Sequence, residues 1–255
     1  MFQTPRKTYH SHETVEELPN LPSHFGILSW NVNKQRQVRE FRQLFHHLKA
    51  AWNLHLLCLQ EARFQPGRPF LVEGFHYYAS ANLARGKTHY GVLTASSAKS
   101  GESLAGLSEG RELYFTTRKP YLLNTLPLPN GQTLLCLNLH AINFRENAQY
   151  TRELRELTTH LTSHRGPMIL SGDFNSWNPV RQKRLETFRR QLSLESVPFD
   201  RKKLKGFGGY PLDFIFYRGL ALKRFAVLEL PEYSDHNPLL AEFETPNNKV
   251  TEERM

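Results

Sequence analysis

The sequence predicts an α/β protein in which two β-sheets pack together and helices lie outside them. Three observations lead to this class. Short apolar runs typical of buried strands recur along the chain, helical segments with one apolar face alternate with them, and two neighbouring runs have the pattern of a hairpin. Because hairpins and longer crossovers are mixed, the strands belong to mixed sheets that need a second layer to cover each apolar face.

One domain accommodates these elements. A chain of 255 residues is long enough for one large α/β domain, and its 39% of hydrophobic residues provide a core. No internal repeat and no long Gly/Ser linker interrupts it. We therefore expect one domain over residues 25–245, with a polar leader over 1–24 and a polar tail over 246–255 that are packed on the surface or disordered.

The first predicted elements are a strand, a helix and a second strand. The segment GILSWNV at 26–32 is apolar and ends in a polar cluster, as a buried strand does. Apolar residues at intervals of three and four then run from Val38 to Leu48, which predicts an amphipathic helix. The segment LHLLCLQ at 54–60 is a second buried strand, and we expect it to end at Glu61.

A third strand and a hairpin follow. The segment HYGVLTAS at 89–96 has the apolar character of a buried strand. The segments YLLNTLPL at 121–128 and TLLCLNLH at 133–140 flank Asn130-Gly131, a pair that readily adopts the positive φ angles of a tight turn. These two runs are therefore predicted to pair as antiparallel neighbours.

The second half of the chain alternates helices and strands. Regularly spaced leucines give an apolar face to a helix over 146–162, and PMILSGDFN at 167–175 follows as a buried strand with a polar end. Asn178-Pro179 predicts the start of another helix, because it supplies an N-cap residue and a proline at the first helical position. Further strands are expected at 212–218, 223–230 and 237–243.

Basic residues outnumber acidic ones, with 33 Lys and Arg against 24 Asp and Glu and a formal net charge of +9. A positive surface favours polyanionic partners, although charge alone does not separate a nucleic-acid-binding protein from a merely basic one. The N-terminus lacks the apolar core of a signal peptide, and no apolar stretch approaches the roughly 20 residues that cross a bilayer. Cys58 and Cys136 have no disulfide or zinc spacing. We expect a cytoplasmic protein without membrane insertion or an obligate protein partner.

Polar residues gather where the predicted strands end, which is where α/β folds assemble their sites. One polar strand end has a simple explanation, because turns favour polar residues. Several ends that together supply acids, amides and histidines are harder to explain in that way. They are Asn31 and Asn33, Glu61, His140 and Asn143, Asp173 and Asn175, and the run Ser234-Asp235-His236.

These residue types suit the hydrolysis of a phosphodiester. Mg²⁺ prefers one or two carboxylates together with waters and a phosphate oxygen, and Glu61 and Asp235 offer such carboxylates. Asp173 has the chemistry of a base that activates water, and amide and imidazole groups can donate hydrogen bonds to the charge that develops around phosphorus. The candidate donors are Asn175, His140 and His236.

The chain carries, in this order, the blocks SWNVNK, LQEAR, LNLHAIN, SGDFNSW, PLDFIFYRG and YSDHNPL. This ordered set resembles the signature blocks of the endonuclease/exonuclease/phosphatase family, which includes DNase I, AP endonucleases, neutral sphingomyelinases and inositol-polyphosphate 5-phosphatases. The blocks run from residue 29 to 239, and the chain is most similar to the uncharacterised bacterial YafD-like branch. The resemblance implies a four-layer α/β sandwich of two mixed sheets flanked by helices (DNase I-like), with Mg²⁺, or alternatively Mn²⁺, as cofactor.

The resemblance also implies which residues hold the metal. Asn31 would orient the metal ligand Glu61, and Asp235 would lie at or near the metal. AP endonucleases usually have Asp at the position of Asn33, so this chain departs from their pattern and a second metal there is disfavoured. We expect Asn33 to contact substrate instead.

The scissile phosphate would lie among the remaining blocks. His140 would face it, with Asn143 supporting His140 and contacting substrate. Asp173 would activate or orient water, and Asn175 would stabilise the transition state. These roles are implied by the resemblance, residue by residue, and they agree with the chemistry that the residue types allow.

The block around Asp213 bears on the substrate. The resemblance pairs Asp213 with His236, which contacts the phosphate. Inositol 5-phosphatases carry Trp-Cys-Asp-Arg at this block, whereas this chain has Leu-Asp-Phe, which disfavours their substrate. Sphingomyelinases would need a signal, a membrane span or an exposed apolar hairpin, and none is evident. A nucleic acid is therefore the preferred phosphodiester, with a lipid or a small phosphorylated metabolite as the alternative.

Basic residues also cluster between the Asp173 and Asp213 blocks, on a predicted helix and the loop after it. Such a cluster can follow a phosphate backbone, although a solvated helix face gives the same pattern. Lys203 and Lys205 are the predicted phosphate contacts within it. A non-catalytic phosphate-binding module is the rival function, and the presence of the candidate base and metal ligand disfavours it. The cluster comprises Arg181, Lys183, Arg184, Arg189, Arg190, Arg201, Lys202, Lys203 and Lys205.

Overall fold

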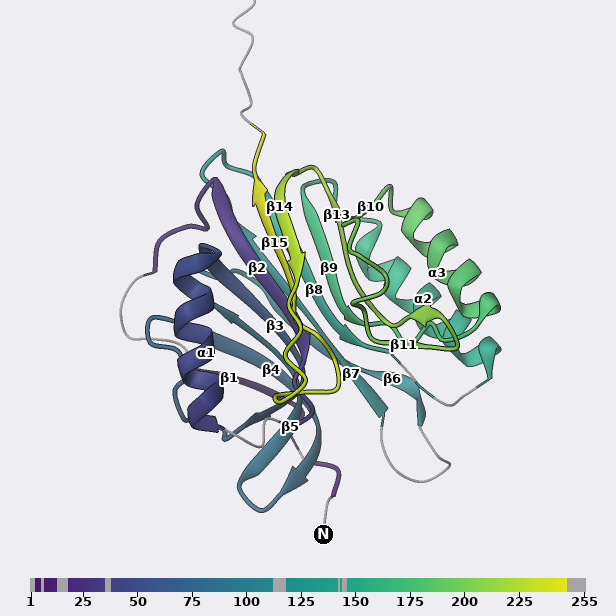
Figure 1. Cartoon of the computed structure of the whole chain (residues 1–255), viewed down its shortest axis with the longest axis horizontal. Coiled ribbons are helices and arrows are strands. Elements are labelled where there is room, and N and C mark those ends of the chain that lie inside the picture. Colours follow the sequence, from purple (N-terminus) through teal and green to yellow (C-terminus); the bar gives the residue numbers. More distant parts are fainter. Residues whose placement is uncertain are drawn as a thin grey trace, which may run out of the picture.

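Two mixed β-sheets pack face to face, and helices cover both outer faces (Figure 1). The computed structural model describes residues 3–5, 7–12, 18–34, 38–111, 118–141, 143 and 146–246. The helices are α1 (Val38–Ala51), α2 (Asn147–Leu161) and α3 (Pro179–Gln191). The predicted four-layer sandwich is confirmed. Among the described residues, no helix has the length and apolar character needed to cross a membrane.

One sheet has seven strands and the other has six, and a short separate hairpin completes the strands. In spatial order, the first sheet contains β1 (Tyr9–His12), β4 (His76–Arg85), β5 (Thr88–Ser96), β3 (Leu54–Phe64), β2 (His24–Asn31), β15 (Leu239–Glu244) and β14 (Ala221–Val227). The second contains β10 (Glu195–Ser196), β13 (Asp213–Arg218), β9 (Met168–Asp173), β8 (Thr133–His140), β7 (Arg118–Pro127) and β6 (Ser103–Arg111). The hairpin pairs β11 (Gly206–Phe207) with β12 (Tyr210–Pro211).

Three apolar layers hold the sandwich together. Phe41 and Phe45 of α1 pack on the outer face of the seven-stranded sheet. Leu157 of α2 and Phe188 of α3 pack on the outer face of the six-stranded sheet. The inner faces of the sheets meet in a central layer that removes large apolar surfaces from water, the main favourable term in folding. Its members include Phe25, Ile27, Leu56, Ile169, Ile215 and Phe243.

Several local predictions are confirmed. β7 and β8 pair as an antiparallel hairpin, and Gly131 in its turn has the positive φ of +78° that the Asn-Gly pair predicts. Asn178 is the N-cap of α3, where its side-chain oxygen accepts a hydrogen bond from the Arg181 backbone N–H at 2.9 Å. Both features were predicted correctly from the local sequence, because a turn or a helix cap depends on only a few neighbouring residues.

Other elements differ from the prediction. Residues 9–12, assigned to a polar leader, form the edge strand β1, which pairs with β4. The strand at 54–60 does not end at Glu61, because β3 continues to Phe64. Glu61 has a φ of +49° and lies where the pairing of β3 with β5 shifts register, as at a β-bulge. Residues 247–255 of the predicted tail lie outside the described residues.

A buried amide joins the two sheets near the ends of their central strands. Asn138 of β8 is fully buried, and its side-chain N–H₂ group donates to the carbonyl oxygens of Leu93 at 2.9 Å and Leu59 at 3.3 Å, both in the facing sheet. Gln60 of β3 donates to the Asn138 side-chain oxygen at 2.8 Å. Because these hydrogen bonds form where water is excluded, they define how β8 lies against β3.

We predict that Asn138→Ala lowers the free energy of unfolding by about 3 kcal/mol, because it removes three buried hydrogen bonds, one from Gln60 and two to the Leu59 and Leu93 carbonyls. Asn82→Ala is the matched control, since its side chain donates to the Arg118 carbonyl at an exposed position, and we expect a loss below about 1 kcal/mol. Urea unfolding measures both values. Equal losses would contradict the role of Asn138 as a link between the sheets.

Candidate active site

The carboxyl ends of the central strands of both sheets meet at one pocket. β2 and β3 are parallel in the first sheet, and β8 and β9 are parallel in the second. Parallel neighbours place their carboxyl ends at the same sheet edge. Across the two sheets, the Asn31 side-chain N–H₂ group at the end of β2 donates to Asp173 Oδ2 at the end of β9, at 3.3 Å. The pocket at this junction has a volume of about 670 Å³.

Most predicted site residues line this pocket. Asp213 lies behind His236, and Lys203 does not line the pocket at all. Lys34, Lys119, Trp177 and Phe207 also line it, and sequence reasoning assigned them no role. The predicted residues that line the pocket are Asn31, Asn33, Glu61, His140, Asn143, Asp173, Asn175, Lys205, Asp235 and His236.

Asp173 occupies a tightly constrained backbone at the end of β9. The preceding residue, Gly172, has a φ of +141°, and an added Cβ there would lie 1.9 Å from the Leu139 carbonyl oxygen, so only glycine fits. The following turn places the Asn175 backbone N–H 3.0 Å from Asp173 Oδ1, to which it donates. Asn175 itself has a φ of +46°, and its side chain donates to the Ala141 carbonyl at 2.8 Å. The Asp173 carboxylate is thereby fixed on both sides.

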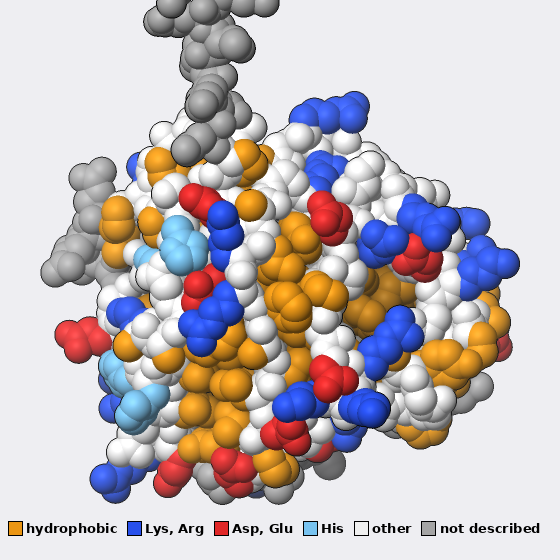
Figure 2. Space-filling model, turned by 45° about the horizontal axis from the view of Figure 1, so that its top comes forward, with side chains coloured by type: hydrophobic (Ala, Val, Ile, Leu, Met, Phe, Trp, Pro, Cys, Tyr) orange, Lys and Arg blue, Asp and Glu red, His pale blue; other side chains and the backbone are white. Residues whose placement is uncertain are grey.

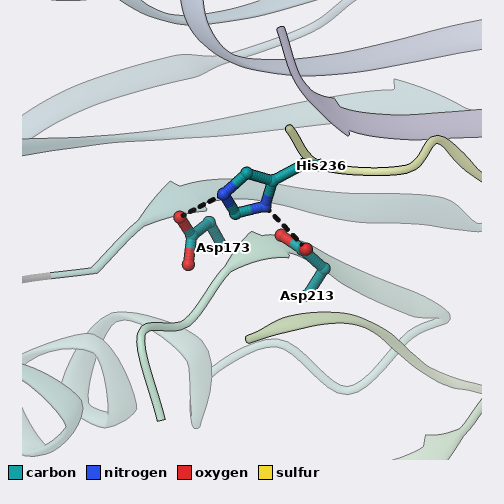
Figure 3. A group of neighbouring side chains, drawn as sticks. All are labelled: Asp173, Asp213 and His236. Carbon is teal, nitrogen blue, oxygen red and sulfur yellow. Dashed lines mark hydrogen bonds and ion pairs between the residues drawn. The ribbon is translucent and has the colours of Figure 1, made fainter. Parts of the chain in front are cut away.

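His236 lies between two buried carboxylates (Figure 3). Its Nδ1 donates to Asp213 Oδ2 at 2.8 Å, and its Nε2 is 4.0 Å from Asp173 Oδ2. Burial alone would lower the pKa of His236, but the charge and hydrogen bond of Asp213 and the charges of Asp173 and Asp235 raise it to about 9. His236 is therefore an imidazolium at neutral pH, with Nε2–H directed toward Asp173.

His140 has the opposite protonation state. Burial and then the charge of the Lys119 ammonium lower the pKa of His140 to about 3. Lys119 Nζ lies 2.8 Å from His140 Nε2 and donates to it. The 3.5 Å separation of His140 Nε2 from Asp173 Oδ2 is therefore not an ion pair, because the ring is neutral. Lys119, on β7, is the cation at this position.

Two further carboxylates in the pocket contact lysines. Lys34 Nζ lies 2.7 Å from Glu61 Oε2, and Lys205 Nζ lies 2.9 Å from Asp235 Oδ2. Asn33 also donates to Asp235, at 3.3 Å. Burial would raise the pKa of both acids, but these lysine contacts lower it below its usual range. Both groups are thus carboxylates at neutral pH, and each is paired with a lysine ammonium group.

The model of the Endonuclease/Exonuclease/phosphatase family matches residues 28–236. The chain belongs to this family. Family members are phosphoric ester hydrolases, so the resemblance found in the sequence blocks is confirmed. The chain is also 36% identical over 231 residues to a UPF0294 (YafD-like) protein of Erwinia tasmaniensis, a match that covers 89% of this chain and 84% of that relative.

Solved structures agree with the family at the level of the fold. An endonuclease/exonuclease/phosphatase from Beutenbergia cavernae has a TM-score of 0.66 and 14% identity, over 87% of this chain and 72% of that one. The AP endonuclease LMAP from Leishmania major has a TM-score of 0.59 and 15% identity, over 88% of each chain. At such low identity these neighbours establish the fold alone.

The basic cluster after the Asp173 block departs from the prediction. Arg181 is fully buried, and its Nη1 donates to the Asn175 carbonyl at 2.9 Å. Arg181 therefore does not follow a phosphate backbone as a member of the predicted cluster, because its guanidinium packs against the Tyr150 and Trp177 rings. Lys203 forms an ion pair with Glu229 at 2.8 Å and lies outside the pocket. Of the two predicted lysine contacts, Lys205 alone lines the pocket.

The outer face of α3 retains part of the predicted positive surface. Lys183 and Arg184 are exposed. Arg189 and Arg190 both pair with Glu186, at 2.7 and 2.6 Å. Figure 2 shows Lys and Arg side chains gathered on the side of the molecule that α3 forms in Figure 1, with acidic side chains among them. This surface lies on the outside of the sandwich and does not line the pocket.

Different sequence signals were available for the residues that were missed. Lys34 and Trp177 lie inside the family blocks SWNVNK and SGDFNSW, so their position beside the site was accessible from the sequence. Lys119 lies outside every block, at the start of β7. It comes close to His140 only because β7 pairs with β8. No local pattern marks it. Phe207 lies in the Gly-rich segment GFGGYP, which signals a turn and no chemistry.

The His236–Asp213 pair predicts a pH-dependent stability. The pKa of His236 is about 9 in the folded protein, against an ordinary value of 6.5. This difference adds about 3 kcal/mol to the free energy of unfolding. The contribution is fully present below pH 6.5 and is lost as the pH rises through 9. In EDTA-treated protein, Asp213→Asn should therefore cost most stability near pH 6 and least near pH 10. Thermal unfolding across this range measures the difference, with Asp200→Asn as a surface control. A pH-independent loss in Asp213→Asn would contradict the assigned protonation state.

Proposed function

We propose that the protein is a Mg²⁺-dependent phosphodiesterase and that its preferred substrates are nucleic acids. The observation that best supports the reaction is the environment of Asp173, a carboxylate held at the base of a pocket by Asn31 and the Asn175 backbone. The cationic His236 and the Lys119 ammonium lie beside it. This arrangement combines a base for water with positive groups for a phosphate.

The donor set of the pocket fits a divalent cation. Glu61, Asp235 and Asn31 offer carboxylate and amide oxygens, which Mg²⁺ and Mn²⁺ prefer. The Glu61 and Asp235 carboxylates each contact a lysine ammonium group, which is also a cation. We assign the metal to Glu61, with Asn31 and Asp235 beside it. A bound Mg²⁺ would neutralise charge on the phosphate and on the departing oxygen.

A second group of possible ligands is less suited to this metal. Asp173, Asp213 and His236 place one ligand atom each within 4.8 Å of one another. However, a metal at His236 Nε2 would have to displace a proton that the neighbouring carboxylates stabilise, since they raise the pKa of His236 to about 9. We therefore assign this group to hydrogen bonding and proton transfer, and not to metal binding.

The protein's own residues account for the proton and charge movements. Water attacks phosphorus, and its proton passes to the Asp173 carboxylate as the new P–O bond forms and the bond to the departing oxygen breaks. The departing oxygen leaves with the electron pair of that bond and takes up a proton from solvent. His236 donates a hydrogen bond from Nε2 to a phosphoryl oxygen, with Asp213 holding its ring through Nδ1. Asn175 stabilises the charge on the phosphoryl oxygens. These are the roles that the residue types and positions support.

Lys119 takes over the role that the sequence gave to His140. The neutral His140 accepts the Lys119 hydrogen bond through Nε2, so this atom has no proton to offer a phosphate. The ammonium group has three N–H donors, and it can donate to a phosphoryl oxygen while it remains bound to His140. We therefore assign Lys119 as the phosphate contact and His140 as the residue that positions it.

Nucleic acid is the favoured substrate because the net charge of +9 favours a polyanion over a single small phosphate. A phosphatase or phosphodiesterase acting on a lipid or a small metabolite is the second candidate, because the family also includes phosphatases. Either substrate would use the same pocket.

We predict that the protein nicks or degrades plasmid DNA, single-stranded DNA or RNA in Mg²⁺, and that EDTA abolishes this activity. Asp173→Asn and Glu61→Gln should each reduce kcat by at least about a hundred-fold with the fold intact, because each removes a group required for the chemistry. Glu186→Gln on the outer face of α3 is the matched control. Turnover of lipid or sugar phosphates alone would refute the nucleic-acid preference, and full activity in both site variants would refute the site.

We also predict that Lys119→Met lowers kcat/KM about a hundred-fold, since a preorganised cation is lost from the phosphate site. Lys99→Met replaces an exposed lysine outside the pocket and should be unaffected. Steady-state kinetics on bis-p-nitrophenyl phosphate compares the two. Near wild-type activity in Lys119→Met would refute the assignment of Lys119 and indicate that His140 contacts the phosphate.

A further inference from the structure

An exposed aromatic side chain stands at the pocket wall. Phe207 is 62% exposed, the largest exposed fraction among the exposed large hydrophobic side chains of the described residues. Among the described residues, the other exposed large hydrophobic side chains are Leu104, Val180 and Phe225, and none of them lines the pocket. The exposure of Phe207 is therefore linked to the site.

The backbone around Phe207 is built to present it. Phe207 pairs with Tyr210 across the β11–β12 hairpin, and the two residues between them are Gly208 and Gly209, with φ angles of +58° and +84°. Two successive positive φ angles are those of a tight type I′ turn, which glycine adopts without strain. The hairpin thus holds Phe207 at the wall, although this costs contact with the core.

Trp177 completes an aromatic wall with Phe207. Their ring centres lie 6.2 Å apart with the planes at 80°. Beneath Trp177, the buried Arg181 guanidinium lies 4.9 Å from the Trp177 ring and 4.5 Å from the Tyr150 ring. Arg181 also donates to the Asn175 carbonyl. Trp177 is therefore held in place by the residue that supports the phosphate site, and it needs no reordering when a ligand binds.

We propose that Phe207 and Trp177 form a stacking site for a nucleobase next to the scissile phosphate. The inference rests on the proposed function and specifies its substrate class. A nucleotide presents a planar ring and an anion joined by a sugar, and the pocket presents an aromatic wall and cationic side chains together. Stacking on aromatic side chains is the usual means of binding bases without sequence preference.

An acyl chain fits the wall less well. A lipid site needs a continuous apolar surface, but the remainder of the pocket is lined by amides, acids and lysines, with Leu212 as the remaining aliphatic side chain among its described residues. A nucleic acid and a free nucleotide share this chemistry, and their sizes distinguish them in the test below.

The test compares two esters with the same leaving group, thymidine 5′-(p-nitrophenyl phosphate) and methyl p-nitrophenyl phosphate. We expect wild-type protein to prefer the nucleotide ester by about ten-fold in kcat/KM, as stacking predicts. Phe207→Ala should remove most of this preference, Phe207→Trp should retain it, and Phe207→Leu should lose it. Phe225→Ala, an exposed phenylalanine on β14, is the matched control. Among oligothymidylates, which share one kind of leaving group, faster hydrolysis of the octamer than of the dimer indicates a nucleic acid, and the reverse indicates a small nucleotide.

A binding measurement separates this inference from the proposed function. Calorimetric titration with adenosine 5′-monophosphate and with ribose 5-phosphate needs no turnover, so it decides the matter even if neither ester is hydrolysed. We expect the nucleotide to bind about ten-fold more tightly, and Phe207→Ala to abolish the difference. Equal affinities in the wild type would overturn the base site. Hydrolysis of both esters with equal kcat/KM would overturn it as well, while leaving the phosphodiesterase assignment intact.

Discussion

The contact between the two sheets at Asp173 is the interaction on which the rest of the site depends. Asn31 of one sheet donates to Asp173 of the other, so neither sheet contains the site alone. The loop that carries His236 is fixed to the same strand as Asn31, since Trp30 Nε1 donates to the His236 carbonyl and Ser234 Oγ donates to the Asn31 carbonyl, both at 2.7 Å. Any change in how the sheets pack therefore changes the distances between the groups that would act on phosphate.

Charge balance in the pocket follows from this packing. Buried acids in one small volume would repel one another, and burial disfavours their charged forms. The lysines that line the pocket reduce this cost by contacting neighbouring polar groups, and His236 does the same as a cation between two carboxylates. Under the proposed function, a metal ion and an anionic substrate would bring in charges of both signs, and Lys34 and Lys205 would exchange their carboxylate partners for phosphate oxygens. The lysine contacts are Lys34 with Glu61, Lys119 with His140, and Lys205 with Asp235.

The sequence predicted what depends on local patterns and missed what depends on distant ones. Apolar periodicity and the ordered family blocks predicted the central strands of both sheets, the helices and most pocket residues, whereas β4 and β6 were not predicted. The bulge at Glu61 was missed because a register shift between β3 and β5 has no local signal. The burial of Arg181 was missed because charge count does not reveal which way a helix faces, and Lys119 became visible only when β7 was placed beside β8. The edge strand β1 has a polar sequence that resembles a leader.

The position of the metal tests the central claim most directly, because two groups of ligands compete for it. Crystals grown with Mn²⁺ would reveal the ion by its anomalous scattering, without reference to activity. We predict a peak bonded to the Glu61 carboxylate, with Asp173, Asp213 and His236 still in contact with one another. A peak bonded to these three residues instead, or no peak in the pocket, would contradict it.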